Sequence, residues 1–252
     1  MRIAKLYTVM ILLMLLGVAG SGCTSGEGQE GIEEGVSGKA AAPENIGLSN
    51  IIENPVTHWN PAGTSPEIAE TAFIHPQAVV IGAATIGERV LVSPHASVRG
   101  DEGMPLFIGN ESNVQEGVVI HGLETIDEEG ETIEAHLIEV NGEMYSVYVG
   151  ERVSLAHQSQ VHGPAFVGND TFIGMQAMVF KARIGNNCVL EPTSGAIGVT
   201  IPDGRYVPAG VVVTSQAEAD KLPEVTDDYG YKHTNEAVVY VNTNLADGYN
   251  AM

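Results

Sequence analysis

The stretch Ala156-His157-Gln158-Ser159-Gln160-Val161-His162-Gly163 lies inside a run, residues 149–179, that decides the fold. Every sixth residue of this run is apolar, and Gly, Ser, Thr, Ala and Asn fill much of the rest; the apolar column is Val149, Leu155, Val161, Val167, Ile173 and Val179. Neither the helical period of 3.6 nor the strand period of 2 selects every sixth position, whereas hexapeptide β-helix repeats do. The run therefore predicts an all-β solenoid whose frame is interrupted by two histidines.

The same frame extends in both directions along the chain. It holds from Ile74 to Val98, resumes from Ile108 to Ile120, and after residue 179 continues to Val213 with a one-residue slip. Each coil of a solenoid lies on the previous one, so every slip in the frame must be a loop or a bulge. With three rungs to a coil, the frame predicts six or seven coils.

Two interruptions of the frame carry acidic residues. The shorter one contains Asp101 and Glu102, and the longer one contains the acidic loop 124–134. After that loop the sequence predicts a β-hairpin that turns at Asn141-Gly142, because this dipeptide favours the tight turn between two strands.

The N-terminus has the three-part build of an export signal. Residues 1–23 combine basic Arg2 and Lys5, an apolar run and small residues before Cys23. The apolar run is short for a membrane span. Cys23 resembles the lipidated cysteine of a lipoprotein signal, so we expect either a cleaved signal or a lipid anchor. The protein is then exported, and is either extracellular or anchored to the outer face of the cell membrane.

The rest of the chain divides into three segments. Residues 24–45, rich in Gly, Ser, Glu and Ala, are expected to form a flexible linker. Residues 46–214 are expected to form the β-helix domain, beginning with an irregular leader over 46–72 in which Trp59 packs on the surface.

The third segment, residues 215–252, loses the period of six and is predicted to be helical. A short helix-forming stretch ends before Pro223, and a longer helix is predicted from Thr234 to about Ala246. The apolar residues expected to face the solenoid are Ala237, Val238, Val241 and Leu245.

Charge and cysteine content limit the possible partners. The formal net charge of −21 repels nucleic acid and anionic membrane surfaces, and disfavours polyanionic substrates such as nucleotides or coenzyme A. A small neutral substrate is compatible with it. If Cys23 is removed or lipidated, Cys188 is the only remaining thiol, so no intrachain disulfide can form.

Three of the eight histidines lie where they could bind a metal. His121 and His162 each follow an inward-pointing rung residue, so they should project in similar directions. His157 should point elsewhere, so the three rings cannot easily meet within one subunit. A metal shared between subunits of a closed threefold assembly would resolve this. Three imidazoles and a water are the ligands of catalytic zinc in carbonic anhydrase.

The alternative is that these histidines are unrelated surface residues. Gln115, Glu102 and Glu124 lie on rungs or loops near the same coil and favour the metal, because they could orient a bound water. The remaining histidines lie in leader, turn or loop contexts and are expected to have no catalytic role; they are His58, His75, His95, His136 and His233.

Several motifs resemble those of the γ-class carbonic anhydrases, particularly the archetype from methane-producing archaea, over about residues 51–249. The motifs are Arg99-Gly-Asp-Glu-Gly-Met-Pro105, Asn113-Val-Gln115, His121-Gly-Leu-Glu124, Ser154-Leu-Ala-His-Gln-Ser-Gln-Val-His-Gly-Pro164 and Asn186-Asn-Cys-Val-Leu-Glu-Pro192. The resemblance implies a left-handed parallel β-helix with a C-terminal α-helix, assembled as a homotrimer with active sites at the subunit interfaces. The usual right-handed crossover preference would not have predicted that handedness.

The resemblance also implies residue roles at the metal. His121, His157 and His162 match the metal ligands, with His157 supplied by the neighbouring subunit. Gln115 matches the residue that holds the metal-bound hydroxide, and Glu102 matches a carboxylate near the metal. Zn²⁺ is the expected metal, and Fe²⁺ or Co²⁺ could occupy the same site.

Further matches lie around this centre. Glu124 matches the proton shuttle at the rim of the acidic loop, and Asn242 matches an active-site asparagine from the C-terminal helix. Arg99 and Asp101 match a structural ion pair at the trimer interface. The expected reaction is the reversible hydration of carbon dioxide to bicarbonate by a metal-bound hydroxide.

Two other functions remain open from the sequence. A hexapeptide-repeat acyltransferase would share the fold and could use one histidine as a general base, but the sequence has no basic cluster to receive a phosphorylated donor. A non-catalytic β-helix scaffold protein would keep the fold without activity. Metal analysis and a carbon dioxide hydration assay distinguish the three functions.

Overall fold

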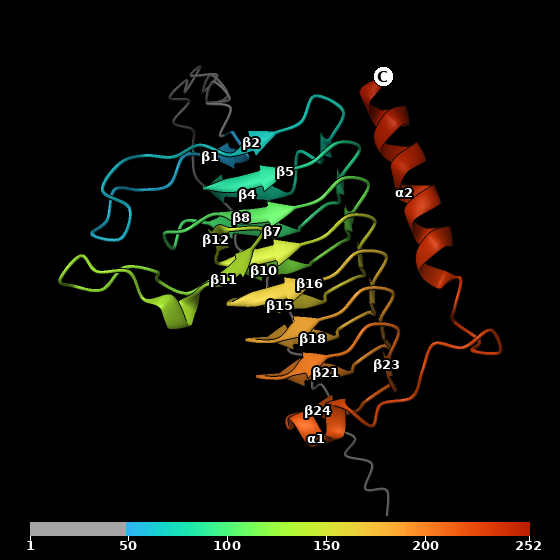
Figure 1. Cartoon of the computed structure of the whole chain (residues 1–252). Coiled ribbons are helices and arrows are strands. Elements are labelled where there is room, and N and C mark those ends of the chain that lie inside the picture. The colour runs from blue at the N-terminus through green and yellow to red at the C-terminus, as the bar shows by residue number, and fades with distance from the viewer. Residues whose placement is uncertain (1–48) are drawn as a thin grey trace, which may run out of the picture. The chain divides into compact units, whose positions relative to one another are not determined.

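The computed structural model describes residues 49–252, so the predicted signal (1–23) and linker (24–45) lie outside the described residues. The chain winds through three parallel sheets that form the walls of a solenoid (Figure 1). Sheet A contains β1 (Ile51–Ile52), β4 (Val79–Gly82), β7 (Ser97–Gly100), β10 (Val119–His121), β15 (Gln160–His162), β18 (Met178–Phe180), β21 (Gly195–Ile197) and β24 (Val212–Val213).

The other two sheets have seven strands each. Sheet B contains β2 (Glu67–Ile68), β5 (Ala84–Ile86), β8 (Leu106–Ile108), β13 (Val147–Val149), β16 (Ala165–Val167), β19 (Arg183–Ile184) and β22 (Thr200–Ile201). Sheet C contains β3 (Phe73–Ile74), β6 (Leu91–Val92), β9 (Asn113–Val114), β14 (Ser154–Leu155), β17 (Phe172–Ile173), β20 (Val189–Leu190) and β23 (Tyr206–Val207).

This arrangement confirms the parallel β-solenoid predicted from the period of six. The solenoid has seven complete coils and an eighth strand in sheet A, slightly more than the six or seven coils expected. The difference arises in the segment 49–72, where the expectation of irregular structure holds for most residues but missed two short strands. Its strands β1 and β2 pair in parallel with β4 and β5 and extend the solenoid by one rung each. The handedness of the coil remains a prediction.

The apolar column of the hexapeptide frame forms the core. Its members between Val149 and Val179 are at most 1% exposed, and they belong to one continuous cluster that runs the length of the solenoid. Strands of two to four residues leave room for only one or two inward side chains each. This is why one large aliphatic residue recurs every six positions, rather than every two as in a longer strand.

Glycines at the corner between sheets B and C allow the coils to stack closely. A Cβ atom on Gly168 would lie 2.7 Å from the backbone nitrogen of Asn186 in the next coil. Asn186 in turn accepts a hydrogen bond through Oδ1 from the backbone N–H of Asn169, at 2.9 Å. Asn110 and Asn169 accept equivalent bonds from Glu88 and Glu151 at other coils, so the side-chain ladder holds this corner in register.

The acidic loop leaves the solenoid between β10 and β13 and projects from its side (Figure 1). The 3₁₀ turn η1 (Glu134–His136) begins at the last residue of this loop, and an antiparallel hairpin of β11 (Ile138–Val140) and β12 (Glu143–Tyr145) follows. Asn141 and Gly142 both have positive φ, at 53° and 87°. The hairpin and its predicted turn are therefore confirmed.

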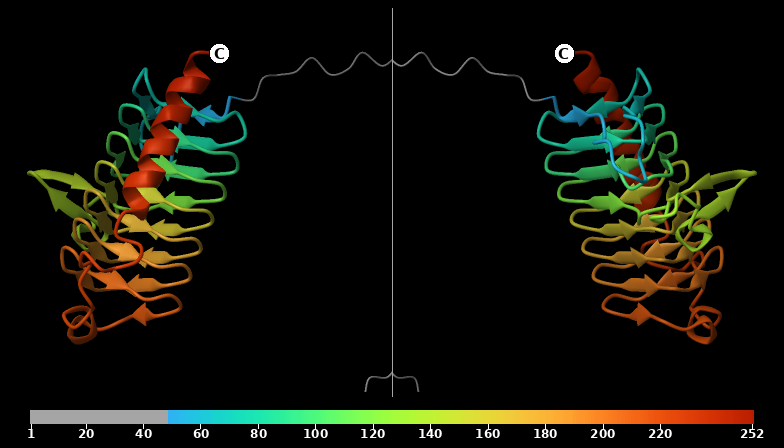
Figure 2. Two further views of the ribbon diagram at one scale, coloured as in Figure 1. Left: turned by 90° about the vertical axis from the view of Figure 1, so that its right-hand side faces the viewer. Right: turned by 90° about the vertical axis from the view of Figure 1, so that its left-hand side faces the viewer.

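After β24 the chain forms α1 (Gln216–Ala219), which is capped by Ser215 and Glu218, and then α2 (Thr234–Asn250). Helix α2 starts where the sequence predicts and runs four residues further than Ala246. It lies along sheet C, beside β3, β6, β9 and β14 (Figure 2). No helix among residues 49–252 is long and apolar enough to cross a membrane.

The predicted solenoid-facing side of α2 was right in part: Val238 packs against the solenoid, but Ala237, Val241 and Leu245 line a cavity and stay exposed. Its buried residues include polar ones and are Asn235, Val239, Asn242, Thr243 and Ala246, while Val241 and Leu245 are 52% and 44% exposed. The helix is anchored by polar contacts at both ends: Asn235 donates to the carbonyl of Arg152 at 2.8 Å, and Asp247 pairs with Arg89 at 2.8 Å. These contacts set its rotation, and its apolar stripe borders a cavity instead of the core.

Candidate metal site

His121 and His162 lie side by side on the outer face of sheet A. They are the last residues of β10 and β15, which pair in register, and their ring centroids are 4.2 Å apart. The same row contains Arg99 before His121 and Phe180 after His162, and the ring of Phe180 lies 4.9 Å from that of His162. The shared direction predicted from the hexapeptide frame is therefore present, and both imidazoles can reach one ion.

Hydrogen bonds at Nδ1 fix the orientation of both rings. Nδ1 of His162 lies 3.0 Å from the carbonyl of Gly163, and Nδ1 of His121 lies 3.0 Å from the carbonyl of Gly122 and 3.1 Å from Oε2 of Glu102. Because a carbonyl only accepts, Nδ1 carries the proton. Nε2 is then unprotonated in the neutral ring, which is the form in which histidine binds a metal.

Glu102 joins this pair of histidines to a cluster of charges. Its hydrogen bond to His121 is the main reason that the pKa of His121 is raised above its ordinary value. Arg99 lies 3.2 Å from Asp101 and 3.7 Å from Glu102. The predicted Arg99–Asp101 ion pair is thus present within one chain, and it holds the loop that carries Glu102 next to His121.

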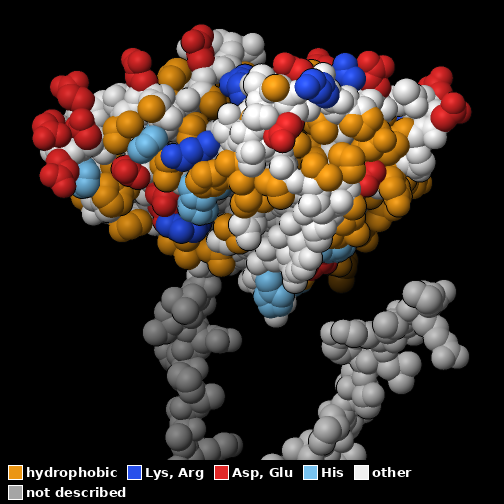
Figure 3. Space-filling view, turned by 90° about the horizontal axis from the view of Figure 1, so that it is seen from below, with side chains coloured by type: hydrophobic (Ala, Val, Ile, Leu, Met, Phe, Trp, Pro, Cys, Tyr) orange, Lys and Arg blue, Asp and Glu red, His pale blue; other side chains and the backbone are white. Residues whose placement is uncertain are grey.

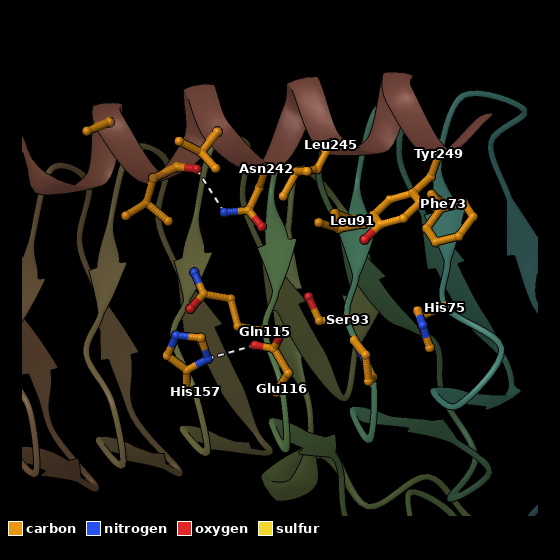
Figure 4. Close-up of a pocket in the computed structure, with 14 residues that line it drawn as sticks. Phe73, His75, Leu91, Ser93, Gln115, Glu116, His157, Asn242, Leu245 and Tyr249 are labelled. Atoms are coloured by element: carbon orange, nitrogen blue, oxygen red, sulfur yellow. Dashed lines mark hydrogen bonds and ion pairs between the residues drawn. The ribbon is translucent and has the colours of Figure 1, made fainter. Parts of the chain in front are cut away.

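His157 lies elsewhere, in the turn between β14 and β15. It lines a cavity of about 530 Å³ between sheet C and α2, together with Gln115 and Asn242 (Figure 4). Nδ1 of His157 is 2.7 Å from Oε2 of Glu116, so this ring too is oriented by an acceptor and presents Nε2 to solvent. All three predicted ligand histidines therefore have the same hydrogen-bonding arrangement.

Gln115 and Asn242 converge on this second group from different elements. Gln115, directly after β9, donates through Nε2 to Oδ1 of Asn113 at 2.9 Å, and Asn113 donates to Oγ of Ser154 at 3.0 Å. Asn242 comes from α2 and is 9% exposed. The buried network holds the Gln115 amide with its oxygen free to accept, since no donor among residues 49–252 bonds to it.

The His121–His162 pair and His157 lie at opposite ends of the strands of sheet A. One chain therefore cannot bring all three histidines to one metal. His157 precedes β15 and His162 ends it, and the strand between them spans roughly 10 Å. Ligand nitrogens about 2.1 Å from one zinc lie within about 4 Å of each other. Accordingly, residues 49–252 contain no cluster of three or more His, Cys, Asp or Glu side chains that could hold a metal. The three histidines predicted to bind a metal thus lie in two separate places, His121 with His162 and His157 alone, which are called half-sites below.

Glu124 lies on the side of the His121–His162 half-site. With Glu102 it lines a second cavity, of about 420 Å³, beneath the acidic loop. Seen from the end of the solenoid, acidic side chains gather at the edge from which this loop projects (left in Figure 3). The side chain of His136 helps to hold the loop, because its Nδ1 lies 2.6 Å from the carbonyl of Glu124.

Sequence reasoning missed three residues that the structure places at the half-sites. Phe180 could have been found, because it follows the rung residue Val179 as His162 follows Val161. Asn113 and Glu116 flank positions already considered, but their contacts with Gln115 and His157 depend on how the side chains turn at a corner. The six-residue frame carries no signal for that.

Comparisons with known proteins agree with this geometry, although no family model matches the chain. The carbonic anhydrase of Methanosarcina thermophila is 66% identical over 245 residues, which cover 97% of this chain and 96% of that protein. The carboxysome assembly protein CcmM of a Nostoc species is 39% identical over 196 residues, and the match covers 77% of this chain but 33% of that protein.

Solved structures of lower identity share the fold alone. A putative acetyltransferase of Bacillus cereus has a TM-score of 0.60 at 20% identity, with 81% of this chain and 99% of that chain covered. A hexapeptide transferase family protein of Anaplasma phagocytophilum has a TM-score of 0.55 at 21% identity, covering 75% and 95%. On the strength of the full-length relative, the chain belongs to the γ-class carbonic anhydrase family.

Proposed function

We propose that this protein catalyses the reversible hydration of carbon dioxide to bicarbonate at a metal shared between two subunits. The observation that carries the proposal is the arrangement of the histidines: each has Nδ1 next to an acceptor, and the three are divided between two edges of sheet A. His121 and His162 of one subunit and His157 of the next would complete the ligand set.

The residues fit a first-row metal because all three proposed ligands are imidazoles whose Nε2 makes no hydrogen bond within residues 49–252. Zn²⁺ suits such a site, and so do Fe²⁺ and Co²⁺. When bound, the metal would lower the pKa of a coordinated water to about 7, so that hydroxide is present at neutral pH to attack carbon dioxide.

The surface around His157 supports a second copy of this chain as the missing partner. The cavity is bordered by apolar side chains of α2 that remain exposed, chiefly Val241 and Leu245. Burying them against a neighbour would remove apolar surface from water. In a heterologous contact, the surface with His121 and His162 on one subunit would meet the surface with His157 on the next. If the ring closes after three copies, the result is a homotrimer with one site at each interface.

The polar side chains near the metal would then orient the attacking oxygen and transfer the proton. The amide oxygen of Gln115 would accept a hydrogen bond from the attacking oxygen and aim it at the substrate, with Asn242 beside it. Hydration releases one proton in each turnover. Glu102 would receive this proton near His121, and Glu124, across the cavity, would deliver it towards solvent.

The central test is anaerobic purification without chelator, followed by metal analysis and a carbon dioxide hydration assay on the same sample. We expect about one metal per subunit and activity that disappears on chelation and returns with Zn²⁺, Fe²⁺ or Co²⁺. Protein without stoichiometric metal would instead favour an acyltransferase, and metal-loaded protein without hydration activity would favour a scaffold.

The role of Glu124 has its own test. In weak buffer, Glu124→Ala should lower kcat because proton release limits turnover, and kcat/KM should change little because that ratio reports the hydration step. Unchanged turnover in weak buffer would remove Glu124 from the proton path.

We also propose that the mature protein acts outside the cytoplasm, either released or held by a lipid at Cys23. This proposal is supported by the sequence of residues 1–23. Mass spectrometry of the native N-terminus would identify a lipidated Cys23 or a cleaved end.

A further inference from the structure

His58 lies in the cavity beneath the acidic loop, together with Glu102 and Glu124. From the sequence alone this histidine cannot be separated from the other surface ones, because residue 58 is remote in sequence from the acidic loop (124–134). The structure brings them together. This cavity, through which the proton is proposed to leave, therefore contains an exposed imidazole as well as carboxylates.

The segment that carries His58 is hydrogen-bonded to the loop that carries Asp101 and Glu102. Nε1 of Trp59 and Nδ2 of Asn60 both donate to the carbonyl of Asp101, at 3.0 and 2.7 Å. The ring of His58 lies edge-on to that of Trp59, with centroids 4.5 Å apart. Asp101 directly precedes Glu102, so the imidazole is held in the same cavity as the carboxylate that contacts His121.

Among the residues that line this cavity, His58 is the one titratable side chain that is not a carboxylate. Besides His58 and Trp59, the lining consists of carboxylates and two isoleucines: Glu102, Glu124, Asp127, Glu128, Ile126 and Ile133. A carboxylate can pass this proton on but is a poor final acceptor, because a carboxylic acid is a much stronger acid than a zinc-bound water. Imidazole is a stronger base than a carboxylate and is the side chain that most often transfers protons in general acid–base catalysis.

We infer that His58 is the terminal proton carrier of this site: its neutral imidazole accepts the proton released by hydration from Glu124 and gives it to a buffer base in solution. The inference rests on the proposed function, because it needs the proton that hydration produces. The ring returns to its neutral form in each cycle, so atoms and charge balance. The surrounding carboxylates stabilise the imidazolium between the two transfers.

The test compares His58→Ala with the wild-type, metal-loaded enzyme by stopped-flow hydration in weak and strong buffer. In weak buffer, kcat of His58→Ala should fall roughly tenfold, while kcat/KM stays within about twofold. Added imidazole should restore kcat, because it can replace the missing ring in the cavity. His58→Phe, which keeps a ring beside Trp59, should show the same loss in weak buffer.

His233→Gln is the matched control, since His233 is an exposed histidine at the start of α2 that does not line this cavity; its kcat should equal that of the wild type. Equal kcat for His58→Ala and wild type in weak buffer would overturn the inference. The inference would also be overturned if imidazole did not restore the kcat of His58→Ala, or if His58→Phe kept the wild-type kcat. Either result would indicate that His58 only packs against Trp59. Failure of the proposed function is separate: the wild type would then show no metal-dependent kcat/KM.

Discussion

Mixing two inactive variants should restore activity if the metal site is divided between subunits as the half-sites require. His157→Ala removes the ligand at one edge of sheet A, and His162→Ala removes a ligand at the other edge. Each homotrimer should be inactive while each β-helix stays folded, since both side chains lie outside the core. A mixed trimer can place an intact His121–His162 pair opposite an intact His157.

The expected recovery follows from the geometry. In a random one-to-one mixture, a given interface is complete only when the His157→Ala chain supplies His121 and His162 and the His162→Ala chain supplies His157. Each condition is met about half of the time, so about one quarter of the interfaces should be complete. Activity per subunit should therefore recover to about one quarter of the wild-type value.

The assay is co-expression with two affinity tags, purification through both tags, and stopped-flow hydration after metal loading. Selection through both tags enriches mixed trimers, so recovery should then be about one third. A mixture of His121→Ala and His162→Ala is the matched control: both ligands come from the same chain in the divided site, so no interface is complete. Recovery by this control, or none by the first mixture, would refute the divided site.

Three further predictions concern the fold. Gly168→Ala should lower the free energy of unfolding by about 1–3 kcal/mol in urea titrations, because the new Cβ meets the backbone of the next coil, whereas Gly248→Ala, with no atom within 4 Å, should not destabilise. Ile173→Ala, which empties a fully buried rung, should cost about 2–5 kcal/mol by the same measurement, and a loss below 1 kcal/mol would contradict a closely packed core. Burial raises the pKa of the Cys188 thiol from 9.0 to about 11, so the unfolded chain ionises first as pH rises. The contribution of this thiol to the free energy of unfolding should therefore be fully present below pH 9. The free energy of unfolding should fall by on the order of 2 kcal/mol as the pH approaches 11, and Cys188→Ala should not show this fall.

The sequence predicted the parts of the site that depend on strand register. His121 and His162 share a position in the six-residue frame, and parallel pairing of β10 with β15 places their rings together. The direction of His157 was also predictable, because it falls in a turn. The buried face of α2 was not, because the pairing of Asp247 with Arg89 and the reach of Asn235 to Arg152 join residues far apart in sequence.

The six-residue repeat was enough to predict the solenoid, the order of its coils, and the separation of His157 from the other two histidines. These features follow from a local repeat, in which each coil needs only its neighbours to bury one aliphatic column. The contacts at the corners and loops became visible only in the folded chain: Glu116 beside His157, Asn242 above Gln115, and His58 in one cavity with Glu124. The physical reason is that these contacts depend on loop paths and helix rotation, which many distant side chains set together.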